Sequence, residues 1–244
     1  MSEWIPGRNG VTEVLKSGRG ITKLYVAEGK NEGSLKEILA KAKEQGVPIR
    51  RVNRKKLDEM YNGNHQGVIA EVAAYDYADV DDILALAAER GEDPFVLMLS
   101  EIESPHNLGA IMRTAEIAGV HGIIIPKDNS VGLNATVAKI ACGAAEYLPV
   151  ARVANLVQTA KDLQGKGLWV YGADMDGTSM WKQDMKGPIL LVIGGEDRGI
   201  PRLLMKTCDF KVTIPMKGNI SSLNASVAAG VMVYEVVRQR SLDK

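Results

Sequence analysis

The sequence predicts an α/β protein in which a parallel sheet, covered by helices on both faces, follows a smaller α/β unit. Continuously apolar runs such as "FVLML" (95–99) and "PILLVIG" (188–194) alternate with helical patterns, as in sheets buried on both faces. The 244 residues, 45% of them hydrophobic, suffice for a large core in one or two domains. Charge divides the chain into residues 1–72 (+4), 73–93 (−6) and 94–244 (+2), which suggests three segments.

The first segment predicts a small α/β unit made of short elements. Its clearest element is a helix at 34–46, with apolar residues at 35, 38, 39 and 42, Ser34 as N-cap and Gly46 as its stop. Turn residues bound the other elements. The remaining expected elements are strands at 21–29, 47–52 and 67–75 and a helix at 54–61.

The second segment predicts a linker and a short acidic helix, and the third predicts a regular alternation of strands and helices. Asp79, Asp81 or Asp82 fits the N-cap of the acidic helix, and Gly91 ends it. The third segment's expected strands are 95–99, 122–125, 147–151, 168–173, 188–193 and 210–214, and its expected helices are 108–118, 133–141, 155–165, 200–206 and 222–240. Parallel sheets bind ligands at the carboxyl ends of their strands, so the loops after 95–99, 188–193 and 210–214 are the places to seek chemistry.

The first of these loops is "SPHNLGAIMRTAEIAGV" (104–120). Pro105 favours an extended residue before it, and Asn107 stands where an N-cap is expected. Arg113 follows six residues later on the first turns of the helix, where the pattern alone favours a solvated position. His106 fits a loop residue better than a base.

The second loop is "IGGEDRG" (193–199), in which three glycines bracket Glu196 just after a buried strand. A glycine-rich turn between strand and helix can hold a nucleotide, although this one is neither a G-x-G-x-x-G nor a lysine-containing phosphate loop. A tight turn with a surface glutamate is the alternative interpretation.

The third loop is "IPMKGNISSLNASVAAG" (214–230), which leads into the last helix. Ser221 or Ser222 is the expected N-cap, and an apolar stripe begins with Leu223 and Val227. Capping explains one small polar residue, but this loop has several. The surplus, which includes Asn219, Asn224 and Ser226, is typical of a ligand site.

Together the three loops resemble the three motifs of the SpoU, or TrmH-like, RNA ribose methyltransferases of the SPOUT superfamily. The front segment, through "GRNGV" (7–11) and "NHQGVIAEV" (64–72), resembles the small substrate-binding domain of the RlmB subgroup. The resemblance implies a trefoil-knotted catalytic domain at 94–244, an RNA-binding domain like ribosomal protein L30e at 1–72, and an acidic linker at 73–93. It also implies a homodimer formed through the catalytic domain, and S-adenosylmethionine-dependent 2′-O-methylation of a guanosine in large-subunit ribosomal RNA.

The resemblance assigns roles residue by residue. The catalytic positions are Asn107, Arg113, Glu196, Ser222 and Asn224, and the cofactor-binding positions are Gly194, Ile214, Met216 and Leu223. A guanidinium is a poor base, so phosphate anchoring and hydroxyl positioning suit Arg113 better than proton abstraction. Methyl transfer is chiefly a task of orientation, and no metal is expected.

The front segment carries the candidate RNA-binding residues. A basic cluster around 50–56 fits a solvated face, but an RNA partner gives it phosphate contacts. The candidates are Arg8, Asn9, Arg50, Arg51, Arg54, His65 and Gln66. A plain loop histidine is the alternative for His65, and Trp4 is expected in the core or an interface.

Composition excludes several other classes of protein. No apolar run is long enough to span a bilayer, and the first ten residues show no secretory signal. The two cysteines, Cys142 and Cys208, lack metal-ligand spacing and favour a reducing compartment, so a cytoplasmic location is expected. A nicotinamide-dependent enzyme would need G-x-G-x-x-G on its first strand turn, which is absent. A transfer RNA substrate and a non-catalytic RNA-binding assembly factor remain as alternatives.

Overall fold

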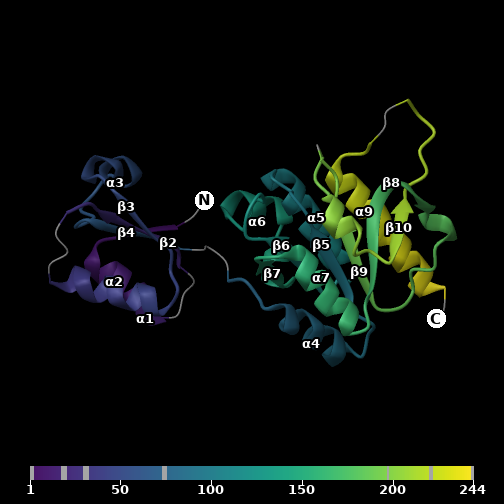
Figure 1. Ribbon diagram of the computed structural model, residues 1–244, viewed down its shortest axis with the longest axis horizontal. Helices are drawn as coiled ribbons and strands as arrows, with labels where there is room; N and C mark the ends of the chain where they lie inside the picture. The colour runs from purple at the N-terminus through teal and green to yellow at the C-terminus, as the bar shows by residue number, and fades with distance from the viewer. Residues whose placement is uncertain are drawn as a thin grey trace. The chain divides into compact units, whose positions relative to one another are not determined.

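The computed structural model describes residues 3–17, 21–29, 33–72, 76–196, 198–219 and 222–242. The chain divides into two compact units, one formed by Met1–Asp76 and Leu133–Ala135 and the other by Tyr77–Gly132 and Thr136–Lys244 (Figure 1). Each unit has its own sheet and its own hydrophobic core. The predicted α/β class, with a parallel sheet behind a smaller α/β unit, is confirmed.

The small unit folds around a mixed sheet with the order β1-β4-β2-β3 among its described residues. Its elements are β1 (Glu3–Pro6), α1 (Arg8–Ser17), β2 (Ile21–Ala27), α2 (Ser34–Glu44), β3 (Ile49–Val52), α3 (Arg54–Met60) and β4 (Val68–Val72). Helices α1 and α2 pack on one face of the sheet and α3 on the other (Figure 1). Leu24 and Val26 of β2 alternate toward the first face, where they join Val11, Leu15 and Ile38 in the core.

Two elements of this unit were missed by the sequence prediction, and one cap was wrong. β1 has four residues and shows no sustained alternation. α1 does carry a helical signal, since Val11, Val14 and Leu15 have i, i+3, i+4 spacing and are buried. Ser34 is the first residue of α2 and not its N-cap, which is Gly33.

The large unit contains a parallel sheet with the order β10-β8-β9-β5-β6-β7 among its described residues. Its elements are α4 (Val80–Arg90), β5 (Phe95–Leu99), α5 (Pro105–Ile117), β6 (Gly122–Pro126), α6 (Ala135–Ala141), β7 (Val150–Val153), α7 (Leu156–Gly165), β8 (Trp169–Ser179), β9 (Ile189–Ile193), α8 (Arg202–Met205), β10 (Phe210–Thr213) and α9 (Ala225–Ser241). Val96 and Met98 of β5 pack with residues of α4, α7 and α8 on one face. The alternate residues Leu97 and Leu99 are equally buried and point to the other face, while α9 contacts both β9 and α5.

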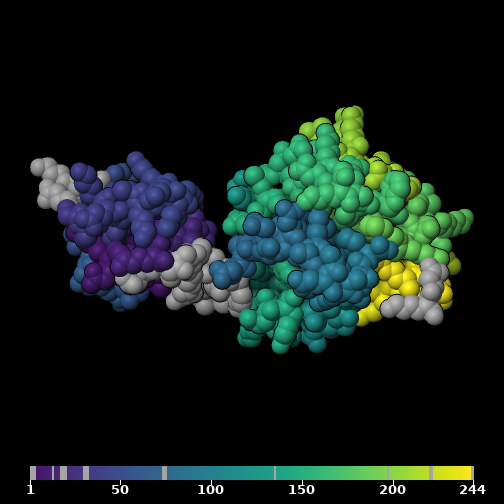
Figure 2. All heavy atoms as spheres, turned by 90° about the horizontal axis from the view of Figure 1, so that it is seen from below, coloured from purple at the N-terminus to yellow at the C-terminus, as the bar shows by residue number. Residues whose placement is uncertain are grey.

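The acidic segment at 77–93 belongs to the large unit. Ile83 and Ala87 of α4 are fully buried, and Ile83 packs with strand residues of the parallel sheet. Figure 2 shows this helix, in blue, lying on the surface of the large unit. Asp79 is its N-cap and donates its backbone N–H to Asp82 at 2.8 Å, and Gly91 ends the helix in the left-handed region at φ 65°. The segment expected to be a linker is therefore part of a packed layer.

His121 links the start of β5 to the loop before it. The Phe95 backbone N–H donates to His121 Nδ1 at 3.0 Å, so the ring proton lies on Nε2, which donates to Glu92 at 3.0 Å. Burial lowers the pKa of this imidazole below its ordinary value of 6.5, against an opposing effect of the Glu92 hydrogen bond. The folded protein therefore favours the neutral ring.

Acidification should accordingly weaken the fold through His121. Below pH 6.5 the unfolded chain takes up a proton that the folded ring resists, so the free energy of unfolding falls as the pH falls. The effect is at most about 1.4 kcal/mol per pH unit. Urea unfolding between pH 7.5 and 5 measures it, and His121→Asn, which keeps an acceptor for Phe95, should show a shallower loss. Equal pH dependence in both proteins would contradict this role.

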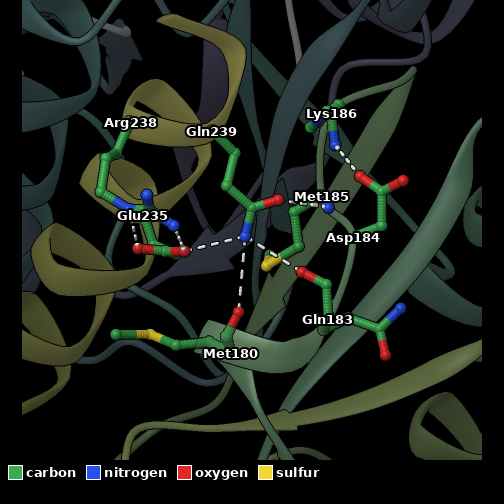
Figure 3. Close-up of polar contacts among 8 residues, drawn as sticks. All are labelled: Met180, Gln183, Asp184, Met185, Lys186, Glu235, Arg238 and Gln239. Atoms are coloured by element: carbon green, nitrogen blue, oxygen red, sulfur yellow. Dashed lines mark hydrogen bonds and ion pairs between the residues drawn. The ribbon is translucent and has the colours of Figure 1, made fainter. Parts of the chain in front are cut away.

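Gln239 ties the last helix to the segment that follows β8 (Figure 3). Its amide oxygen accepts from the Met185 backbone N–H at 2.8 Å, and its nitrogen donates to Glu235 at 2.8 Å and to the Gln183 carbonyl at 3.0 Å. Arg238 donates to both oxygens of Glu235, which chiefly lowers the pKa of that carboxyl. One buried amide thus fixes α9 to the segment between β8 and β9.

Replacing Gln239 with leucine should destabilise the protein by about 2–3 kcal/mol, since the Met185 N–H loses its acceptor and Glu235 loses a donor. The midpoint of urea unfolding measures the loss. Gln158→Leu is the matched control, because Gln158 bonds Asp162 on an exposed helix surface and should change stability by less than about 0.5 kcal/mol. Similar losses in the two variants would show that Gln239 is not a structural tie.

Candidate active site

The three polar loops meet at the carboxyl ends of β5, β9 and β10, and one amide joins them. Asn224 Nδ2 donates to Asn107 Oδ1 at 3.1 Å and to Glu196 Oε1 at 2.5 Å. Asn107 and Asn224 are 117 positions apart in the sequence. We call Asn107, Glu196 and Asn224 together the amide cluster. The structure therefore brings together Asn107, Glu196 and Asn224 of the predicted catalytic set.

The orientation of Asn224 is set by the last helix. Asn224 is the N-cap of α9, and its Oδ1 accepts from the backbone N–H groups of Ser226 at 3.0 Å and Val227 at 3.3 Å. The Ser226 hydroxyl donates to the same oxygen at 2.6 Å. The oxygen is thus engaged by the helix, so the NH₂ group must face Glu196 and Asn107.

This geometry corrects two predicted caps. Ser222 precedes the last helix and does not cap it, and Ser221 lies outside the described residues. Asn107 is likewise not an N-cap but the third residue of α5, whose N-cap is Ser104 with Pro105 at the first helical position. The early start of α5 buries Asn107 to 8% exposure and turns its amide toward Asn224.

The turn after β9 needs its glycines. A Cβ on Gly194 would lie 2.2 Å from the carbonyl carbon of Gly199, and one on Gly195 would lie 2.5 Å from the carbonyl oxygen of Glu101. Gly199 has φ 62° and donates its N–H to the Gly195 carbonyl at 3.0 Å. The turn closes on itself and packs against Glu101 in the segment after β5. This packing holds Glu196 at the exposed tip of the turn.

A hollow of about 540 Å³ opens beside the amide cluster. Six predicted site residues line it: Gly194, Glu196, Ile214, Met216, Ser222 and Leu223. The sequence prediction missed Asp174 and Met175 of β8, Met205 of α8 and Met232 of α9, which line it too. β8 extends to Ser179, beyond its predicted end at 173, and this polar continuation gave no apolar signal.

Arg113 lies apart from the amide cluster. It follows Asn107 by six residues, which places it about 240° further around the helix. Its side chain is exposed, and its Nη1 lies 3.5 Å from Cys142 Sγ. Arg113 does not line the hollow.

The candidate RNA-binding residues of the small unit differ in how exposed they are. His65 is 2% exposed, its Nε2 pairs with Asp58 at 2.8 Å and its Nδ1 accepts from the Gly67 N–H at 3.0 Å. Its ring is therefore structural and not available to RNA, in line with the plainer interpretation. Arg8 donates its backbone N–H to the Gln66 side chain at 3.1 Å, and Asn9 beside it is exposed. Arg50, Arg51 and Arg54 are exposed.

Two further observations concern the described residues only. None of their clusters of three or more His, Cys, Asp or Glu could hold a metal ion, and none of their helices is long and apolar enough to cross a membrane. Both cysteines are free thiols, and burial raises the pKa of Cys208 to about 12.

A parallel α/β sheet with a glycine-rich turn, a hollow and a polar cluster at its carboxyl edge defines a class of small-molecule-binding α/β enzyme domains. Residues 94–234 match the SpoU rRNA Methylase family, and residues 4–78 match the RNA 2′-O ribose methyltransferase substrate binding domain. The chain belongs to the SpoU, or TrmH, family of RNA methyltransferases.

One relative agrees with this assignment, and two solved structures share the fold. The chain is 49% identical to YacO of Bacillus subtilis, named as a TrmH family tRNA/rRNA methyltransferase, over 98% of this chain and 96% of that one. It also resembles the crystal structure of the SpoU methyltransferase AviRb from Streptomyces viridochromogenes in complex with AdoMet, with a TM-score of 0.63, 24% identity and coverage of 98% and 90%. An AdoMet-bound rRNA methyltransferase from Sinorhizobium meliloti has a TM-score of 0.60, 24% identity and coverage of 97% and 87%.

Proposed function

We propose that this protein transfers a methyl group from S-adenosylmethionine to the ribose 2′-hydroxyl of a guanosine in large-subunit ribosomal RNA, as an RlmB-like member of its family. The observation that carries the proposal is the amide cluster, which unites all three motif loops beside a hollow at the carboxyl edge of the sheet. A non-catalytic assembly factor would not need these polar residues. Transfer RNA is the alternative substrate, since the names of the relatives cover both RNAs.

The hollow fits the proposed cofactor in size and chemistry. Its volume of about 540 Å³ lies within the range of small-molecule sites, roughly 300–1,000 Å³. Four methionines and Leu223 supply an apolar wall, while Glu196 and Asp174 favour a positively charged centre. Gly194, Ile214, Met216 and Leu223 would hold S-adenosylmethionine there. When bound, it supplies an electrophilic methyl group on a sulfonium sulfur.

The polar residues then orient the RNA. Asn224, fixed by the helix, donates its two N–H groups to Asn107 and Glu196, which holds the Glu196 carboxylate at the rim of the hollow with Ser222. We assign to Arg113 the anchoring of a substrate phosphate and the positioning of the 2′-hydroxyl, whose proton passes to that phosphate or to water. Such positioning supplies much of the rate of a group transfer.

We propose that Arg113 serves the site of a second copy in a homodimer. Arg113 and Ile117 stand four residues apart on the exposed side of α5, and α5 packs against α9. The α9 stripe predicted from the sequence is exposed: Val227 is 49% and Tyr234 is 48% accessible. With Val231 between them, these exposed side chains have the i, i+4, i+7 spacing of one helix face, which is typical of a subunit interface.

The front unit, predicted at 1–72, is proposed as the RNA reader, and residues 94–244 as the catalytic domain. The trefoil knot and the likeness to ribosomal protein L30e stay predictions from the family resemblance. A knot affects how the segment that holds the cofactor is fixed, but it does not change which residues form the amide cluster.

The test uses S-adenosylmethionine with a labelled methyl group and two unmodified RNA pools, one ribosomal and one transfer. A 2′-O-methyl group blocks alkaline cleavage at its ribose, so resistant linkages map the product. One resistant guanosine in large-subunit RNA supports the proposal in full. Label in transfer RNA alone would overturn the substrate, and no label with bound cofactor would favour the non-catalytic role.

A further inference from the structure

One face of the small unit's sheet displays an aromatic pair. Trp4 pairs in register with Glu71, and Tyr25 pairs with Ile69 and Arg50. Since the alternate residues Leu24, Val26 and Ala70 point into the core under α1 and α2, these side chains point to the opposite face. The Trp4 and Tyr25 rings lie 5.6 Å apart at 55°, and both residues are partly exposed.

Helix α3 covers only part of this face and leaves a second hollow, of about 540 Å³, at its border. We call it the front hollow, and its lining includes Tyr25, Arg50, Asn53, Lys55, Lys56 and Met60. Lys56 pairs with Glu59 at 3.2 Å. Among the described residues no side-chain hydrogen bond or ion pair engages Arg50 or Lys55. Two cations are therefore available beside an aromatic ring.

The charges of the front hollow indicate which part of a nucleotide it accepts. Glu28 and Glu59 also line it, and their carboxylates disfavour a phosphate inside. Carboxylates and the Asn53 amide suit the N–H donors and carbonyls on the edge of a base. Arg50 and Lys55 suit the phosphates on either side of that base. A ring, base-edge partners and flanking cations together fit a nucleotide of a single strand, because paired bases cannot stack on a side chain.

We propose that the front hollow holds an unpaired base of the RNA substrate against Tyr25, with neighbouring phosphates on Arg50 and Lys55. This site deepens the proposed function, on which its identification as a substrate contact depends. It differs from the site formed by Arg8 and Asn9 at the start of α1 and by Gln66, because none of these residues lines the front hollow.

Binding of the full-length protein to fluorescein-labelled oligouridylate, across a range of salt concentrations, tests the site. Tyr25→Ala should weaken binding about tenfold, and Tyr25→Phe, which keeps the ring, should stay within about twofold of wild type. Arg50→Ala/Lys55→Ala should reduce the slope of log K against log salt by about 1.4, or about 0.7 for each phosphate contact. An RNA duplex of the same length should bind more weakly than the single strand.

The matched control is Lys36→Ala/Lys43→Ala, which removes two exposed cations from α2 on the opposite face. It should leave the affinity and the salt slope near wild type, and thermal melts should show every variant folded at the assay temperature. If Tyr25→Ala unfolds, the Arg50→Ala/Lys55→Ala variant still tests the site, because it changes only exposed side chains.

Three results would overturn the front hollow as an RNA site: no binding of oligouridylate by wild type, equal affinity for duplex, or equal losses in the control and the Arg50/Lys55 variant. Methyl transfer is measured separately on the same proteins. Transfer to RNA with normal binding by the Tyr25 and Arg50/Lys55 variants would reject only this site. The full binding pattern without methyl transfer by wild type would reject only the proposed reaction.

Discussion

Replacing Arg113 with alanine is expected to lower the rate of methyl transfer to RNA by about 10³-fold, because the variant loses the cation that we propose anchors the phosphate and positions the hydroxyl. The affinity for S-adenosylmethionine should stay within about twofold of wild type, since Arg113 does not line the hollow. Single-turnover transfer of labelled methyl and calorimetric cofactor binding measure the two quantities separately.

Two further variants make the Arg113 result specific. Arg113→Lys should recover only part of the rate, because an ammonium cannot form the bidentate contact of a guanidinium with phosphate. Arg90→Ala removes an exposed arginine from α4, on the face of the sheet away from α9, and should transfer methyl at the wild-type rate. A large loss of cofactor affinity in Arg113→Ala would mean that the residue belongs to the cofactor site.

The strands that the sequence predicts best are those that the folded protein buries on both faces. β5, β6 and β9 are apolar throughout, so their pattern needs no knowledge of neighbours. β1 and the second half of β8 were missed because their side chains are partly exposed, and pairing with β4 or β10 stabilises them instead. The convergence of the three loops was predictable from the carboxyl-edge rule for parallel sheets.

The details of the site depend on competition between neighbours that a sequence does not resolve. Ser222 and Asn224 could both cap the last helix, and only the folded chain shows that Asn224 does so while its NH₂ group reaches Glu196. The last helix is apolar on two sides, with Val233 buried and Val231 exposed. The sequence prediction named only the stripe that begins with Leu223 and Val227, which is the exposed one, because periodicity cannot tell which stripe the chain covers itself.

Replacing Asn224 with aspartate should reduce methyl transfer by about 10²-fold or more while leaving the helix cap intact. The retained oxygen still accepts from the Ser226 and Val227 N–H groups, so the cap is kept and the free energy of unfolding should fall by only about 1–3 kcal/mol. The NH₂ group, however, becomes an oxygen that faces the Glu196 carboxylate and can no longer donate to Asn107. Rate and urea midpoint are measured on the same preparation.

Asn155→Asp is the matched control for this variant. Asn155 caps α7 by accepting from the Gln158 N–H at 3.1 Å, and it belongs to no part of the candidate site. The control should keep both its stability and its rate of methyl transfer. Normal turnover by Asn224→Asp would show that the amide cluster needs no donor at this position, and unfolding of that variant alone would show that its chief role is structural.

Mixing the two inactive variants tests whether Arg113 acts on the partner's site. A mixed dimer joins an Arg113→Ala chain, whose amide cluster is intact, to an Asn224→Asp chain, whose Arg113 is intact. If Arg113 acts across the interface, one site in each mixed dimer is complete. Random exchange then restores about a quarter of the wild-type rate, since half of the dimers are mixed and each has one working site. If Arg113 acts within its own chain, neither site is complete and mixing restores nothing.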